Sequence, residues 1–156
     1  MPWKNEKDAY KIWISEIILQ QTRVNQGWDY YNRFVQSFPD IKSLATADLE
    51  KVLKLWEGLG YYSRAKNLHV TAVTILEKFN GQFPSSYSDV ISLKGIGEYT
   101  ASAILSFAFD QRYAVLDGNV HRLFSRYLGI SIGLQSKAEK DYYQRIAIGF
   151  LDQNHT

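Results

Sequence analysis

Apolar side chains recur every three or four residues along most of the chain, which is the period of an amphipathic α-helix. Within residues 65–79 they form one stripe, at Leu68, Ala72, Ile75 and Leu76. Further helices are predicted over residues 9–20, 23–38, 49–56, 99–109, 119–128 and 137–151. No convincing strand alternation of apolar and polar residues is visible. The pattern predicts an all-α protein of about seven or eight helices.

The predicted helices are joined by short segments that contain glycine or proline, at residues 58–60, 81–84, 95–97 and 117–118. Such segments are typical of turns between packed helices. No repeat or low-complexity linker divides the chain. We therefore expect residues 1–156 to form one unit.

Composition limits the chemistry of this unit. The 156 residues carry a net charge of +2, which permits nucleic-acid binding without indicating it. The chain has no cysteine, so thiolate-bound metals are excluded, and its three histidines stand far apart. No apolar run reaches the length of a membrane span, and no signal peptide is visible. We expect a cytoplasmic protein without a metal site, whose many aromatic residues serve core packing or base stacking.

Two glycines flank one aliphatic residue in Gly95-Ile96-Gly97, between two predicted helices. Ile96 fits the gap between the helices, while the amides that follow point outward at a helix start, where the helix dipole favours an anion such as a DNA phosphate. The next helix begins with small residues that allow close packing. The pattern favours a helix-hairpin-helix element over residues 93–100, and an ordinary tight turn is the alternative.

Asp117 immediately precedes a predicted helix, in the sequence Leu116-Asp117-Gly118-Asn119-Val120. An aspartate at this position commonly caps the helix, and Asp117 or Asn119 can do so. A capping carboxylate remains available for catalysis, because the helix N-terminus favours its ionised form. Both roles stay open for Asp117.

Glu16 is a charged residue among isoleucine, leucine and tryptophan in the helix of residues 9–20. Burial there would raise its pKa and suit it to be a general acid, and the alternative is a plain surface glutamate. Gln20, Gln21 and Thr22 end this helix with amide and hydroxyl groups that suit base edges or an emptied position in a base stack.

Two tyrosines, Tyr61 and Tyr62, leave the glycine-rich turn of residues 58–60, and Arg64 and Lys66 follow. Aromatic and basic side chains side by side are typical of nucleic-acid contact. The alternative is a hydrophobic anchor followed by a solvated helix start.

Together these segments resemble the helix-hairpin-helix DNA glycosylases, and within them the MutY-type A/G-specific adenine DNA glycosylases. The matching stretches are residues 2–4, 15–22, 56–64, 67–69, 93–100 and 116–120. The resemblance runs from residue 2 to about residue 130 and more weakly to the end. It implies the helix-hairpin-helix DNA glycosylase fold, mostly the helical barrel lobe with a curtailed second lobe.

The resemblance implies an enzyme that flips adenine mispaired with 8-oxoguanine or guanine out of double-stranded DNA and hydrolyses its glycosidic bond. Glu16 would protonate the adenine, and Asp117 would stay ionised under the sugar. Gln21 and Tyr61 match residues that occupy or wedge the stack. Tyr99 stands where bifunctional relatives such as endonuclease III carry a Schiff-base lysine, so a monofunctional glycosylase is expected.

The complete predicted site joins a catalytic group to a DNA-binding group. The catalytic residues are Glu16, Asp117 and Tyr99, and the DNA-binding residues are Gln20, Gln21, Thr22, Tyr61, Arg64, Gly95, Ile96, Gly97 and Asn119.

The chain departs from the family in several features. The family has an iron–sulfur cluster held by four cysteines, a C-terminal domain that helps to read 8-oxoguanine and a helix before Pro2, and none of these is present. We expect a core fragment or a naturally reduced form, without cofactor except for a monovalent or divalent cation left open at the hairpin. It would act as a monomer at the nucleoid of a bacterial-type cell. A DNA-binding module with lost or residual turnover, or a glycosylase for another base, remains an alternative.

Overall fold

The computed structural model describes residues 6–151, which form nine helices and no strand, so the all-α prediction is confirmed. The helices are α1 (Ala9–Leu19), α2 (Val24–Ser37), α3 (Ile41–Ala45), α4 (Leu49–Leu55), α5 (Ser63–Lys78), α6 (Tyr87–Ser92), α7 (Glu98–Phe109), α8 (Gly118–Leu128) and α9 (Lys137–Phe150). All seven predicted helices are present, and two short helices, α3 and α6, were not predicted.

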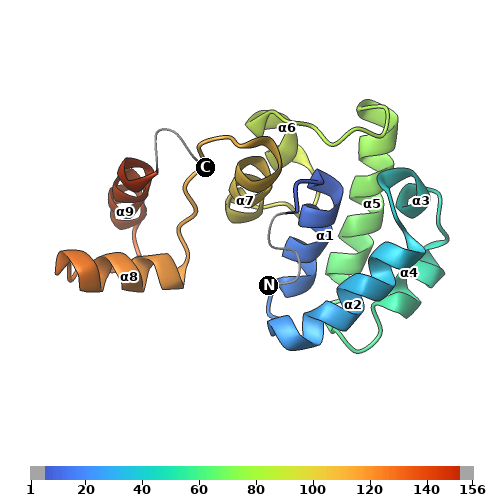
Figure 1. The fold of residues 1–156 in the computed structure, drawn as a ribbon, viewed down its shortest axis with the longest axis horizontal. Helices are drawn as coiled ribbons and strands as arrows, with labels where there is room; N and C mark the ends of the chain where they lie inside the picture. Colours follow the sequence, from blue (N-terminus) through green and yellow to red (C-terminus); the bar gives the residue numbers. More distant parts are fainter. Residues whose placement is uncertain (1–5, 152–156) are drawn as a thin grey trace.

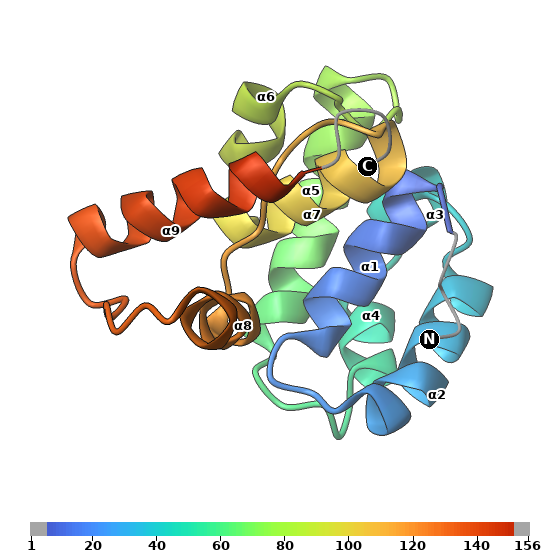
Figure 2. The same ribbon diagram turned by 60° about the vertical axis from the view of Figure 1, so that its left-hand side comes forward.

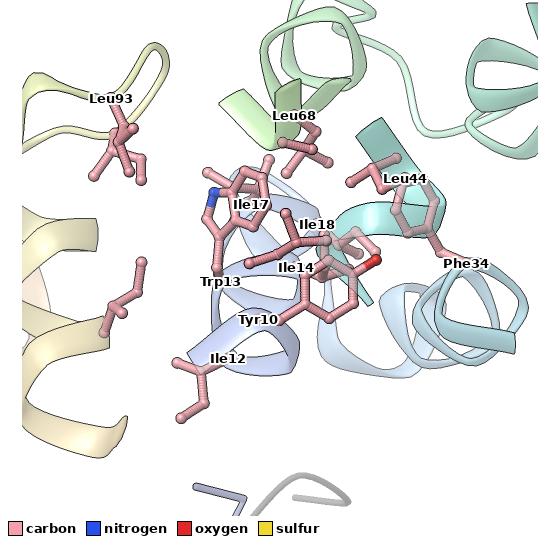
Figure 3. Packing of buried hydrophobic residues seen from close by; sticks show 14 of the residues in the cluster. Tyr10, Ile12, Trp13, Ile14, Ile17, Ile18, Phe34, Leu44, Leu68 and Leu93 are labelled. Carbon is pink, nitrogen blue, oxygen red and sulfur yellow. The ribbon is translucent and has the colours of Figure 1, made fainter. Parts of the chain in front are cut away.

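The first seven helices enclose one hydrophobic core, with α1 at its centre (Figure 1). Apart from its half-buried ends, α1 buries nearly every side chain, and Trp13 and Ile14 are fully enclosed. Figure 3 shows its side chains meeting Phe34 of α2, Leu44 of α3 and Leu68 of α5. Because burying one such side chain contributes roughly 1.5–3 kcal/mol, α1 is firmly fixed. Any polar group on α1 is therefore held in a defined position.

A second, smaller cluster joins α8 and α9 to the segment that leads into them. Tyr143 of α9 is fully buried, and its hydroxyl donates to the carbonyl oxygen of Ile132 at 3.0 Å. The Gln144 side-chain amide donates to the carbonyl oxygen of Ala114 at 2.7 Å, which fastens α9 to the connecting segment. Figures 1 and 2 show α8 and α9 projecting from the seven-helix body. The described residues thus form a larger helical lobe and a smaller second lobe.

Two further sequence observations concern the N-terminal stretch and membrane spans. The matching stretch at residues 2–4 lies outside the described residues. Within residues 6–151, no helix has the length and apolar character that crossing a membrane requires.

Candidate active site

Glu16 lies on a stripe of α1 that is only half-buried. Gln20 follows four residues later, on the same face of the helix, and the two side chains are both half-buried. The Gln20 side-chain amide donates to Thr100 Oγ1 of α7 at 3.4 Å, so this stripe faces the start of α7. Burial raises the pKa of the Glu16 carboxyl. Of the two sequence interpretations, the structure favours the buried acid over the plain surface glutamate.

Tyr99 connects the two predicted carboxylates. It stands in the first turn of α7 with its side chain partly exposed. Burial raises the pKa of its hydroxyl, and the negative charges of Glu16 and Asp117 raise it further. Both carboxylates are therefore close enough to act on one tyrosine. Tyr99 on α7 thus lies within electrostatic range of the two other residues predicted as catalytic, Glu16 on α1 and Asp117 before α8.

Asp117 caps α8, as one of its two sequence interpretations required. Its Oδ1 accepts hydrogen bonds from the backbone amides of Asn119 at 2.9 Å and Val120 at 2.8 Å. The Asn119 side-chain amide donates to the other carboxylate oxygen at 3.3 Å. These bonds orient the carboxylate at a helix N-terminus, where negative charge is favoured. The side-chain oxygen of Asn119 also accepts from Arg122 at 2.7 Å, so Asn119 supports Asp117 from an exposed position.

The predicted hairpin lies between α6 and α7. Ile96 is buried in the main core, as the sequence predicted. Gly97 is the N-cap of α7, and within the described residues no side chain caps this helix start. Because glycine has no side chain, the N-cap residue of α7 gives no side-chain hydrogen bond to the first amides of this helix. Gly97 has an ordinary φ of −96°, and a Cβ atom added to it would meet nothing within 4 Å, so the fold does not require glycine there.

Gly95 has a different role from Gly97. Its φ is +82°, and a Cβ atom there would lie 2.8 Å from the Cβ of Asn67 on α5. Thr71, also on α5, donates from its hydroxyl to the Lys94 carbonyl oxygen at 2.8 Å. The hairpin is therefore docked tightly on α5 through residues that the sequence analysis did not single out, although Asn67 lies in a matching stretch.

We expect Gly95→Ala to destabilise the protein, because the new Cβ meets Asn67 in a left-handed backbone conformation. Such a residue costs on the order of 1–3 kcal/mol before any clash is counted. Gly60→Ala is the matched control, since Gly60 has a φ of +70° but nothing within 4 Å of an added Cβ. Chemical denaturation should show a larger loss for Gly95→Ala. Equal losses would contradict the tight docking of the hairpin on Asn67.

The two predicted stack-inserting residues share an unusual backbone. Gln21 has a φ of 60° and Tyr61 a φ of 45°, both in the left-handed region that favours glycine. Gln21 is exposed, and the Tyr61 side chain is 67% exposed. Thr22, beside Gln21, is half-buried and donates its amide to the Leu19 carbonyl oxygen at 3.2 Å. Strained, exposed residues of this kind occur often at ligand-binding sites.

The Arg64 side chain, which the sequence analysis expected to contact DNA, makes internal hydrogen bonds in the structure. Its guanidinium points into the protein, and both terminal nitrogens donate to backbone carbonyl oxygens of the segments around Gln20 and Gly60. Direct contact between Arg64 and DNA stays a prediction, and the contacts observed are internal.

A cleft of about 450 Å³ lies beside Tyr99, between α6, α7 and α9. Its lining includes Glu98, Ser102, Lys140 and Gln144, and neither Glu16 nor Asp117 is among the lining residues. This cleft therefore adjoins Tyr99, while Glu16 and Asp117 lie outside its lining.

The donor set does not fit the iron–sulfur cluster implied by the resemblance, because the chain has no cysteine. Within the described residues, no three potential metal ligands among histidine, aspartate and glutamate gather at one place.

Comparison with known proteins agrees with the geometry. An adenine DNA glycosylase of Buchnera aphidicola subsp. Baizongia pistaciae (strain Bp) is 50% identical over 132 residues, covering 85% of this chain and 38% of that protein. The adenine DNA glycosylase of Mus musculus is 43% identical over 139 residues, covering 83% of this chain and 27% of that protein. The chain thus spans well under half the length of these curated relatives.

The fold is shared with solved structures of similar proteins. A thermostable thymine-DNA glycosylase superposes with a TM-score of 0.85 at 25% identity, covering 96% of this chain and 69% of that one. A trapped endonuclease III–DNA covalent intermediate gives a TM-score of 0.78 at 19% identity, covering 91% of this chain and 67% of that one. The second likeness shows the fold alone.

The hairpin between α6 and α7 and the two helical lobes define a helix-hairpin-helix glycosylase fold. Residues 14–146 match the family described as HhH-GPD superfamily base excision DNA repair protein. The chain belongs to this superfamily.

Proposed function

We propose that this chain carries the catalytic core of an adenine DNA glycosylase, which acts on adenine mispaired with 8-oxoguanine or guanine in double-stranded DNA. The observation that carries the proposal is that a half-buried glutamate, Glu16, and a helix-capping aspartate, Asp117, both lie within electrostatic range of Tyr99. The similarity to adenine DNA glycosylases over most of the chain supports adenine as the base. Acting on chromosomal DNA would place the protein in the cytoplasm at the nucleoid.

The two carboxylates suit the reaction because their surroundings differ. Breaking a glycosidic bond builds positive charge on the sugar and negative charge on the departing base. Glu16 is half-buried, and burial raises the pKa of its carboxyl, which suits it to donate a proton to the adenine. Asp117 is held at a helix N-terminus by two amides, so it would remain ionised and stabilise the sugar cation. Water would then complete the hydrolysis.

Tyr99 is the reason that we propose a monofunctional glycosylase. A phenol cannot form an imine with the sugar, so no lyase step through Tyr99 is expected. Strand cleavage after base release should therefore need added alkali.

The test uses a duplex that carries one adenine opposite 8-oxoguanine, incubated with the protein and then treated with alkali. We expect a strand break at the adenine after alkali and none before it. Control duplexes carry adenine opposite guanine, adenine opposite thymine, and thymine opposite guanine. Cleavage at thymine would indicate a glycosylase for another base. Binding without release of any base would indicate a DNA-binding module that lacks turnover.

The hairpin is proposed to hold a DNA phosphate at the uncapped start of α7. Gly97→Thr should leave stability unchanged or raise it, because threonine suits both the N-cap position and the extended backbone there. Its hydroxyl would take the amides that the phosphate uses, so affinity should fall about equally for all DNA sequences. Thermal melting and binding to several duplexes check both expectations. A loss that depends on sequence would argue for base contact at the hairpin.

A further inference from the structure

Arg64 stands in the first turn of α5 with its guanidinium among the ends of two other segments. Its Nη1 lies 2.5–3.1 Å from three carbonyl oxygens near the end of α1, and its Nη2 lies 3.1–3.3 Å from two in the glycine-rich turn. The five acceptors belong to Ile17, Ile18, Gln20, Leu59 and Gly60. One side chain thus bonds two segments that are far apart in the sequence.

These carbonyl groups need a partner because a helix end leaves its last carbonyl oxygens without amides. The Leu19 oxygen accepts from the Thr22 amide at 3.2 Å. Arg64 takes the oxygens of Ile17, Ile18 and Gln20, as a basic side chain at a helix C-terminus can. The guanidinium also lies 5.1 Å from the ring centre of Trp56 and 5.8 Å from that of Tyr61.

Two of the five acceptors, the carbonyl oxygens of Gln20 and Gly60, connect Arg64 to the residues expected to contact DNA. Gln20 directly precedes Gln21, and Gly60 directly precedes Tyr61. Gln21 and Tyr61 are the two exposed residues with left-handed backbone that the resemblance places in the base stack. The same guanidinium therefore holds the residue before each of them.

We infer that Arg64 is a positioning residue, which fastens the turn after α1 to the glycine-rich turn so that Gln21 and Tyr61 enter the duplex as one rigid unit. The part of this inference that concerns DNA rests on the proposed function. Arginine is required because its planar fork reaches both sets of carbonyl groups, whereas a lysine ammonium is a single point. Because misplacing reacting groups by an ångström costs up to roughly 10²-fold in rate, loosening the two turns should slow catalysis.

A positioning role for Arg64 and direct phosphate contact by Arg64 would have different effects on DNA affinity and on rate. A phosphate contact contributes to affinity and to its salt dependence, and removing one lowers the slope of log affinity against log salt by about one. A positioning residue leaves that slope unchanged and lowers the rates of flipping and excision.

Arg64→Lys tests the positioning role while keeping the positive charge, and Arg64→Gln tests phosphate contact by removing that charge. We expect a fall of about tenfold or more in the single-turnover rate of adenine release, given the cost of misplacement. Fluorescence of a 2-aminopurine next to the target adenine should show the same fall in flipping, with an unchanged salt slope. Tyr10→Phe is the matched control. It removes a buried hydrogen bond of 2.6 Å that the Tyr10 hydroxyl donates to the Phe38 carbonyl oxygen, at the other end of α1. Wild-type rates in Arg64→Lys, or a slope lowered by about one in Arg64→Gln, would overturn the inference.

A second measurement needs neither DNA nor activity. The chain has no cysteine, so spin labels on Arg23→Cys and Tyr62→Cys, both at exposed positions, report only the distance between the two turns. We expect a narrow distance distribution with Arg64 and a broader one with Arg64→Lys, while Tyr10→Phe leaves it narrow. An unchanged distribution in Arg64→Lys would refute the coupling.

A third measurement uses the unmodified chain, so it remains decisive where Arg64→Lys does not fold. The Thr22 amide bonds to Leu19 and the Leu59 amide bonds to Trp56, each within its own turn. If Arg64 couples the turns, both amides should exchange with deuterium at the same opening free energy. Different opening energies would contradict the coupling. If the wild-type chain releases no adenine, the proposed function fails, while the label and exchange results still decide the role of Arg64.

Discussion

Glu16→Gln is expected to abolish adenine release while leaving DNA binding nearly unchanged. The amide keeps the size and polarity of the side chain on the half-buried stripe of α1 but has no acidic proton to give the departing base. Losing a general acid typically lowers a rate by about 10²–10⁴-fold. Single-turnover excision and equilibrium binding measure the two effects separately. Release at the wild-type rate would remove Glu16 from the mechanism.

The same substitution has a predictable effect on stability. Burial raises the pKa of Glu16, so the folded protein disfavours its ionised form. Its contribution to stability is fully present below the pKa of the unfolded chain and is lost as the pH rises through the raised folded-state pKa. Glu16→Gln removes this loss, so at pH 7 the variant should melt at the wild-type temperature or above it. Wild-type excision should also slow as the pH rises through the pKa of Glu16.

Exposed Glu77 on α5 supplies the control for both measurements. Glu77→Gln makes the same chemical change outside the site, so it should alter neither excision nor the dependence of stability on pH near that raised pKa. A variant of Glu16 that melts well below the wild type at pH 7 would contradict the buried-acid interpretation.

Periodicity predicted the longer helices because each presents a continuous apolar stripe to the core. The two helices it missed, α3 and α6, have five and six residues, too few to show a repeated stripe. Their signals were local ones. Asp40 and Ser43 form a capping box at α3, and Ser86 caps α6 through the Asp89 amide. Capping patterns followed by apolar residues would have located both helices.

The site was predicted in part, for reasons that differ between residues. The buried setting of Glu16 and the capping position of Asp117 follow from neighbouring residues, so local sequence indicated both. The inward direction of Arg64 depends on carbonyl groups up to 47 residues away, which no local pattern contains. The left-handed backbone of Gln21 and Tyr61 was also hidden, because glutamine and tyrosine do not signal it as glycine does.

Asp117→Asn should reduce excision by on the order of 10²–10³-fold, the size of effect seen when a preorganised electrostatic group is lost. Asparagine keeps an oxygen that can accept from the Asn119 and Val120 amides, and it caps helices as well as aspartate does. The loss of charge at the helix N-terminus should cost only about 0.3–1 kcal/mol of stability. Single-turnover rates and the free energy of unfolding should therefore change to very different extents.

Asp48→Asn allows the capping role to be separated from the catalytic one. Asp48 caps α4 through the Glu50 amide at 2.9 Å, within the larger lobe and outside the predicted site. The two substitutions remove the same charge from the same kind of helix start, so their costs in stability should be similar. Only Asp117 acts electrostatically on Tyr99 together with Glu16, so only its substitution should slow excision. If the activity of Asp117→Asn falls no further than its loss of folded protein explains, Asp117 is a helix cap alone, and the sugar cation must be stabilised by another group.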